Sequence, residues 1–140
     1  MSGSDRTSAN KSLVRQFVNA LNRNDIITIR KLIHERHAVQ GALRNRTRAG
    51  PEAIVGALTR LRTRDPQLHY ILEDSIAEDD TVVARWRLTR TGQESPTARN
   101  HHEGITMCRI VDGKVVESWT YIRKLGKDDF TGRSAKSKGV

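Results

Sequence analysis

The feature that most constrains the fold is the pair Asp112-Gly113, which separates two runs in which apolar and polar residues alternate. The run before it is ITMCRIV, and the run after it is KVVESWTYIRK. An Asp-Gly pair between two such runs is a strong signal for a β-hairpin, because a tight two-residue turn needs a positive φ at both positions. We therefore expect two antiparallel strands, at about 101–111 and 114–124.

A second hairpin is predicted upstream, in the segment LHYILEDSIAEDDTVVARWRLTRTG (68–92). Apolar residues occupy every second position over much of this segment, which is the period of a strand with one buried face. Acidic residues at 78–80 interrupt the pattern and mark the turn. A polar loop, QESPTARN (93–100), connects this hairpin to the one around Asp112-Gly113.

The first half of the chain has the period of a helix instead. Leucine, phenylalanine and valine recur every three or four residues in 10–24, which predicts an amphipathic helix. Asp25 can cap a second helix over 26–34. The sequence GPE at 50–52 is typical of the start of a third helix, because proline suits the first helical position. The sequence DP at 65–66 ends that helix.

Helices followed by antiparallel strands indicate an α+β fold, in which helices pack on one face of a sheet. The segment 35–49 is expected to be irregular or to add a short strand. A strongly curved antiparallel sheet covered by three N-terminal helices makes a cone, and pockets form in such mouths. We expect one domain over 10–125, a flexible segment over 1–9 and a polar, basic tail over 126–140.

Composition narrows the classes of function. No apolar run approaches the roughly 20 residues that a membrane helix needs, and the start of the chain has no apolar segment typical of a secretory signal. Cys108 is the only cysteine and cannot form an internal disulfide, which favours a reduced, cytoplasmic setting. A phosphate-binding loop, a dinucleotide fingerprint and a serine elbow are all missing, so no cofactor is expected.

The net charge of +9 makes nucleic-acid binding an alternative. The arginines are dispersed along the chain, however, and only 4% of the residues are aromatic, which is poor for base stacking. Neither an RNA-binding aromatic motif nor a helix-turn-helix pattern accompanies them. The same charge would favour an encounter with an acidic partner.

Counting outward from the turn predicts which residues of the last hairpin share a face. Val111 is expected to pair with Lys114, and partners across two strands lie on the same face. A one-residue bulge would exchange the faces beyond it. An apolar stripe suited to a homodimer is expected on one face, with Ile105, Met107, Val116 and Ile122. Groups able to bind or move protons are expected on the other face, with His102, Gly104, Thr106, Cys108, Glu117, Trp119, Tyr121 and Arg123.

Four segments together resemble a known family. They are LVRQFVNALNRNDIITIRKLI, GPEAI, IAEDDTVVARWRLT and GITMCRIVDGKVVESW. Over 10–125 the chain resembles the SnoaL-like polyketide cyclases of the nuclear transport factor 2-like superfamily, whose fold is a cone-shaped α+β barrel. That superfamily includes cyclases, ketosteroid isomerases, limonene-epoxide-hydrolase-like enzymes, dehydratases and proteins without catalysis, so the resemblance is more specific for fold than for function.

The resemblance implies a catalytic acid about four residues after a strand tryptophan. Counted from Trp119, that position holds Arg123. The Arg-x-Asp pair that the resemblance associates with the epoxide hydrolases is Arg85-x-Arg87 here. Neither carboxylate pattern is present, so another group would have to act as the base.

The expected catalytic set comes from the predicted polar face. His102 titrates near neutrality and would act as the base, while Tyr121 and Arg123 would stabilise the enolate that forms. Two histidines in HERH, at the end of the second helix, are expected at the lip of the pocket, and without further ligand-type residues at suitable spacing they predict no metal site. The expected substrate-pocket residues are Trp119, Trp86, Thr106, His34 and His37.

Three functions are compatible with these observations. The first is a small-molecule enzyme or accessory protein of polyketide-type secondary metabolism, including enediyne and other antibiotic biosynthesis, that acts by cyclisation, isomerisation or dehydration through an enolate. The second is a non-catalytic pocket protein that binds a small hydrophobic, acidic or carrier-tethered polyketide ligand. The third is a basic nucleic-acid-binding protein, whose binding would weaken steeply with salt.

Overall fold

The computed structural model describes residues 2–41, 50–90 and 102–124, which form three helices and five strands. The helices are α1 (Gly3–Arg23), α2 (Ile26–Leu32) and α3 (Pro51–Arg64). The strands are β1 (Ile33–Gly41), β2 (Leu68–Glu78), β3 (Thr81–Arg90), β4 (His102–Val111) and β5 (Lys114–Lys124). The predicted loop at 93–100 and the predicted tail at 126–140 lie outside the described residues.

The predicted order of helices and strands is confirmed, with differences at three boundaries. α1 begins at Gly3, within the segment predicted to be flexible, because the Ser2 side chain caps the helix by accepting a backbone hydrogen bond from its first turn. α2 ends at Leu32 rather than at 34, because Ile33 already pairs with β5. The short strand allowed by the sequence in 35–49 is β1, which starts two residues earlier.

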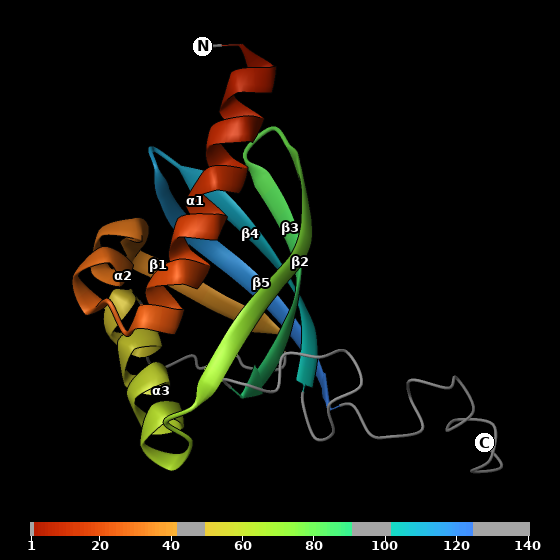
Figure 1. Ribbon diagram of the computed structural model, residues 1–140. Coiled ribbons are helices and arrows are strands. Elements are labelled where there is room, and N and C mark those ends of the chain that lie inside the picture. The colour runs from red at the N-terminus through yellow and green to blue at the C-terminus, as the bar shows by residue number, and fades with distance from the viewer. Residues whose placement is uncertain (1, 42–49, 91–101, 125–140) are drawn as a thin grey trace, which may run out of the picture.

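The five strands form one sheet in the order β1-β5-β4-β3-β2. The strands from β5 to β2 are antiparallel, whereas β1 runs parallel to β5 at one edge, so the sheet is not wholly antiparallel. Figure 1 shows that the helices lie on one face of the twisted sheet, which we call the covered face; the opposite one is the open face. The α+β cone predicted from the sequence is therefore confirmed.

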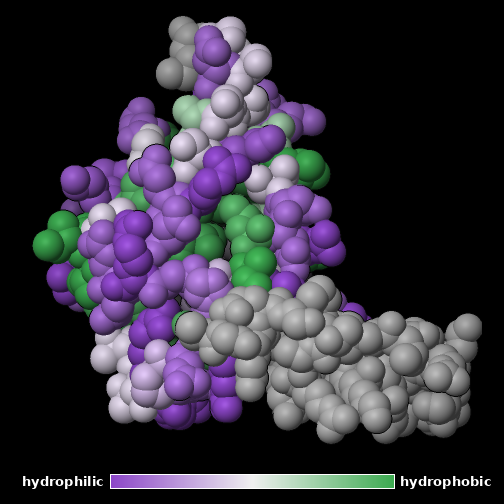
Figure 2. Space-filling view, in the orientation of Figure 1, coloured by the Kyte–Doolittle hydropathy of each residue, from purple (hydrophilic) through white to green (hydrophobic). Residues whose placement is uncertain are grey.

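The hydrophobic core lies between the helices and the covered face. Ile29 of α2 is fully buried there, against alternate residues of the central strands. Figure 2 shows that the described residues present a mostly hydrophilic surface in the same view, with small hydrophobic areas. None of the described helices is long and apolar enough to cross a membrane. The strand residues that define the covered face by their burial are Val82, Ala84, Cys108, Ile110 and Val115.

Gly50 connects the start of α3 to β1. Its φ is +81°, and its backbone N–H donates a hydrogen bond of 3.0 Å to the carbonyl oxygen of His37. A Cβ at this position would lie 2.3 Å from the carbonyl oxygen of Glu35. Both the positive φ and the close approach require glycine, so α3 can start this near to the strand that carries His37.

Candidate functional site

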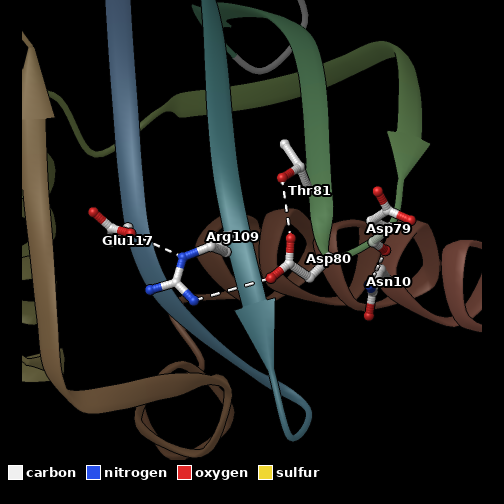
Figure 3. Close-up of polar contacts among 6 residues, drawn as sticks. All are labelled: Asn10, Asp79, Asp80, Thr81, Arg109 and Glu117. Carbon is white, nitrogen blue, oxygen red and sulfur yellow. Dashed lines mark hydrogen bonds and ion pairs between the residues drawn. The ribbon is translucent and has the colours of Figure 1, made fainter.

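The last hairpin contains a one-residue bulge in β5. The two residue pairs next to the turn are those predicted, but Arg109 then lies opposite Glu117, so Val116 has no partner in β4. Figure 3 shows the Arg109 guanidinium bonded to Glu117, over 2.9 Å. Every later pair is shifted by one residue. The prediction that Cys108 and Glu117 share a face is therefore wrong, and Cys108 lies opposite Ser118.

This bulge separates the predicted catalytic residues. Because side chains alternate along a strand, one extra residue moves all later ones to the other face. The prediction that His102 shares a face with Tyr121 and Arg123 is wrong. The covered face carries His102, Gly104, Thr106 and Cys108 of β4 with Ser118, Thr120 and Ile122 of β5, whereas Glu117, Trp119, Tyr121 and Arg123 are on the open face.

Arg123 is engaged by an acid on the open face. Its Nη2 donates to Oε1 of its cross-strand neighbour Glu103, over 2.6 Å. Tyr121 is 65% exposed on the same face. The enolate-stabilising roles predicted for Tyr121 and Arg123 stay predictions, and they would have to be exerted from the side of the sheet that the helices leave uncovered.

Trp86 is part of a hydrogen-bonded cluster on the covered face. Its indole Nε1–H donates to Thr106 Oγ1 over 2.9 Å, and Thr106 Oγ1 lies 3.1 Å from Thr120 Oγ1. The indole lies against Gly104, where a Cβ would come within 2.3 Å of the ring, so this position requires glycine. The ring of Tyr70 packs edge-on against the indole, with 5.8 Å between centroids. Two predicted pocket residues, Trp86 and Thr106, are thus brought together.

His37 is buried in the interior rather than at a lip. Only 1% of it is exposed, its Nε2 lies 3.0 Å from Ser118 Oγ, and its buried Nδ1 has no hydrogen-bond partner among the described residues. Burial lowers the pKa of His37 from 6.5 to about 4, although the charge of Glu117 acts in the opposite direction. The imidazole is therefore neutral at pH 7, and one of its nitrogens can accept a proton.

The other two described histidines singled out by the sequence have less enclosed positions. His34 is half-buried in β1, where its Nδ1 accepts a hydrogen bond of 3.0 Å from the backbone N–H of Arg36. His102 is half-buried at the start of β4, opposite Leu88 of β3. Within the described ranges, three or more metal-ligand side chains never gather at one place.

The buried part of the site is uncharged. Among the residues whose burial is described, no aspartate or glutamate is buried. Cys108 is buried, and burial raises the pKa of its thiol to about 12, so the thiol carries no charge at neutral pH. The covered face therefore offers hydroxyl, indole and imidazole groups, and no carboxylate among the described residues is buried there. The buried polar residues are Asn10, His37, Thr89 and Thr120.

Sequence reasoning missed Ser118 and Thr120, because counting from the turn placed both on the wrong face. One signal for the bulge was present in the sequence. Val115 and Val116 are adjacent β-branched residues, and they break the alternation of apolar and polar residues next to the turn. Such a break is expected where two residues of one strand oppose a single residue of the other.

The comparisons with known proteins agree with this architecture. Residues 14–118, more than half of the chain, match the family model described as a SnoaL-like domain. IdmH, a candidate polyketide cyclase from Streptomyces antibioticus, is 21% identical with a TM-score of 0.68, covering 81% of this chain and 91% of that one. A candidate SnoaL-like polyketide cyclase from Jannaschia sp. CCS1 is 18% identical with a TM-score of 0.70, covering 87% and 90%.

A third solved structure covers more of the chain. AclR, a candidate hydroxylase from Streptomyces galilaeus, is 25% identical with a TM-score of 0.67, covering 94% of this chain and 87% of that one. No curated protein matches the sequence. Because the family model spans most of the helices and strands that build the cone, this chain belongs to the SnoaL-like family, with the nuclear transport factor 2-like fold.

Proposed function

We propose that this protein is an enzyme of polyketide-type metabolism that cyclises, isomerises or dehydrates a carbonyl compound through an enolate. The observation that supports the proposal best is His37, a neutral imidazole held beside a hydroxyl in the protein interior. Two solved structures of the same fold are described as candidate polyketide cyclases, so ring closure is the reaction that we favour.

His37 would act as the base in place of a carboxylate. When Nε2–H donates to Ser118 Oγ, Nδ1 is unprotonated, and none of the described residues gives it a hydrogen bond. Nδ1 takes a proton from the carbon next to the substrate carbonyl, and the electrons of that C–H bond form the enolate double bond. The enolate carbon then attacks a second carbonyl of the same molecule, and the imidazolium returns its proton to the resulting alkoxide.

The cluster around Trp86 would stabilise the enolate oxygen. The indole N–H polarises Thr106, and the hydroxyl chain through Thr120 ends in a proton that can be donated to an oxyanion. Because His37 is only 1% exposed, a substrate has to displace the side chains that cover the imidazole. The proposal therefore requires this part of the covered face to open when substrate binds.

The test uses a generic ketone and two matched variants. We would follow deuterium uptake at the α-carbon of 1-tetralone in D2O by NMR, with wild type, His37→Gln and His102→Gln. A glutamine in place of His37 can still bond Ser118 but cannot remove a proton, so His37→Gln should lose the acceleration and His102→Gln should keep it. The reverse pattern would assign the base to His102, the residue predicted from the sequence. No acceleration by the folded wild type would contradict enolate chemistry.

A non-catalytic pocket protein is the second candidate. It is favoured by the lack of a buried carboxylate among the residues whose burial is described, and by the engagement of Arg123 with Glu103. In that case 1-tetralone would shift the indole N–H resonance of Trp86 without any deuterium exchange. The same samples thus distinguish binding from catalysis.

We propose that two copies associate through the open face. Ile105 and Met107 lie there as predicted and are 48% and 37% exposed, and Ile76 is 70% exposed. Ile122, also predicted for this stripe, lies on the other side of β5. An exposed apolar area on a sheet face is typical of an interface. Met107→Glu should yield monomers in sedimentation analysis, and an unchanged dimer would contradict the proposal.

An acidic acyl carrier protein is the partner that we propose for substrate delivery in a cytoplasmic setting, and nucleic acid is the alternative. The net charge of +9 supports both. Several arginines are already paired with acids, including Arg85 and Arg90 of β3, which leaves fewer cations for phosphates. The test is binding at 150 mM salt, roughly the physiological ionic strength. Binding to a carrier protein but not to duplex DNA would support the carrier protein as the partner.

A further inference from the structure

A groove of about 490 Å³ lies between α1 and β2. Its lining includes neither His37 nor Thr106 and Thr120, although one lining residue, Tyr70, also packs against Trp86. Figure 1 shows α1 lying alongside β2, which is one of the two edge strands of the sheet. The wall formed by β2 is the segment 69–75. The wall formed by α1 is a stripe along the helix, with Lys11, Arg15, Val18, Asn19 and Asn22.

The groove is held by hydrogen bonds at both ends. At one end the Asn22 side chain takes the place of a neighbouring strand, because Nδ2 donates to the Tyr70 carbonyl (2.9 Å) and Oδ1 accepts from the Tyr70 N–H (2.7 Å). At the other end Asn10 Nδ2 donates to the carbonyl of Asp79 over 3.4 Å (Figure 3). Between these ends β2 has an irregular register at Glu73. The walls are therefore fixed before any ligand binds, which lowers the entropic cost of binding.

In the groove, the acidic side chains have ion-pair partners among the described residues and the basic side chains do not. Glu73 and Asp74 of β2 are each paired with an arginine of β3. Lys11 and Arg15 lie one helical turn apart and have neither a hydrogen bond nor an ion pair with any described residue. Two free cations beside two neutralised acids give the groove a net positive charge.

We propose that this groove binds a small molecule with one anionic head group, such as a carboxylate, on an apolar aromatic or acyl body. Lys11 and Arg15 would bind the head group, and Asn19 would add an amide donor. Val18 and Leu72, both half-buried, supply the apolar contact. The site is separate from the residues proposed for catalysis, so this inference does not depend on the proposed function.

The test uses 1-anilinonaphthalene-8-sulfonate, whose sulfonate stands in for the head group and whose rings stand in for the body. Affinity is measured by fluorescence titration for wild type, for Lys11→Gln/Arg15→Gln and for Arg60→Gln/Arg64→Gln. The last variant is the matched control, because Arg60 and Arg64 are exposed on α3 with the same spacing and the same loss of charge. We expect roughly tenfold weaker binding for the groove variant and less than about twofold for the control.

NMR shifts identify where the probe binds, and an uncharged probe tests whether the sulfonate is needed for the effect of the groove variant. The backbone amides of Leu72 and Ser75 should shift on titration, and N-phenyl-1-naphthylamine, which lacks the sulfonate, should bind all three proteins equally. Equal weakening by both double variants would mean that only overall charge matters and would overturn the proposal. Shifts centred on Thr106 and Thr120 instead would place the probe at the hydroxyl cluster and would overturn the proposal as well.

Discussion

The two faces of the sheet are built from the same strands but carry different chemistry. On the covered face, Trp86, Thr106 and Thr120 are joined by hydrogen bonds between uncharged groups. On the open face, β4 and β5 present a charged pair, in which Arg123 donates to Glu103. An uncharged, partly buried network makes strong demands on geometry, because each polar group that loses both water and its partner is costly. A solvated ion pair makes few such demands. The bulge at Val116 decides which of the two sets contributed by β5 is enclosed.

Deleting Ser118 is the strongest test of whether the bulge sets this difference between the two faces. If β5 then pairs without the bulge, the Glu117 carboxylate comes to lie opposite the buried Cys108 without Arg109 as its partner. If the bulge stays, Arg123 turns toward the covered face instead. We expect a loss of at least about 3 kcal/mol in the free energy of unfolding, measured by urea denaturation. A fully stable protein with wild-type amide shifts in β4 would show that the bulge does not set the faces.

The pH dependence of stability tests the burial of His37. Its pKa is about 4 in the folded protein, against the ordinary histidine value of 6.5 in the unfolded chain, so the unfolded chain binds more protons between these values. Stability should therefore fall as the pH falls from about 6.5 to about 4, by at most about 3 kcal/mol, and then level off.

The comparison between wild type and His37→Gln isolates this contribution, since carboxylates titrate in both proteins. Urea denaturation at pH 4.5 and pH 7.5 measures it. An equal pH dependence in wild type and His37→Gln would contradict the lowered pKa.

A smaller loss is expected from Gly104→Ala on the covered face. The added methyl group would meet the Trp86 indole at 2.3 Å, so the ring has to move and its bond to Thr106 has to weaken. Overpacking of this kind costs about 1–3 kcal/mol. Thermal unfolding measures the loss, and Ile105→Val on the open face, which is 48% exposed, is the control that should change little. Equal losses of stability for Gly104→Ala and Ile105→Val would contradict the expectation that the covered face is more sensitive to substitution than the open face.

The smallest effect is expected from Arg123→Gln on the open face. The ion pair with Glu103 is solvated, since the Arg123 side chain is 62% exposed, and such pairs contribute less than about 1 kcal/mol. Urea denaturation at low and high salt should show little difference from wild type. A loss as large as that of Gly104→Ala would mean that the open face is covered in solution, as the proposed dimer would require.

Much of the fold could be predicted because its signals are local. The positive φ values at Asp112 (52°) and Gly113 (73°) confirm the turn that the Asp-Gly pair predicts. Asp25 caps α2 as predicted by accepting from the Thr28 hydroxyl and backbone N–H, and these bonds, the hydroxyl bond first, lower the pKa of the Asp25 carboxyl. Each of these features depends on residues within four positions of one another.

The candidate site could be predicted only in part. Trp86 and Thr106 lie together on the covered face, and His37 lies in the interior, but its hydroxyl partner Ser118 is 81 positions away in the chain. The parallel pairing of β1 with β5 creates that contact, and a helical pattern that continued to residue 34 gave no indication of it.

The sequence by itself determined the α+β class, the hairpin turns, the family resemblance and the lack of its carboxylate motifs, because these follow from local periods and from the identity of single residues. Only the tertiary structure decided which face of β5 is enclosed and which histidine side chain is buried away from solvent. Both depend on register and on contacts between distant segments, where one extra residue, Val116, reverses the outcome.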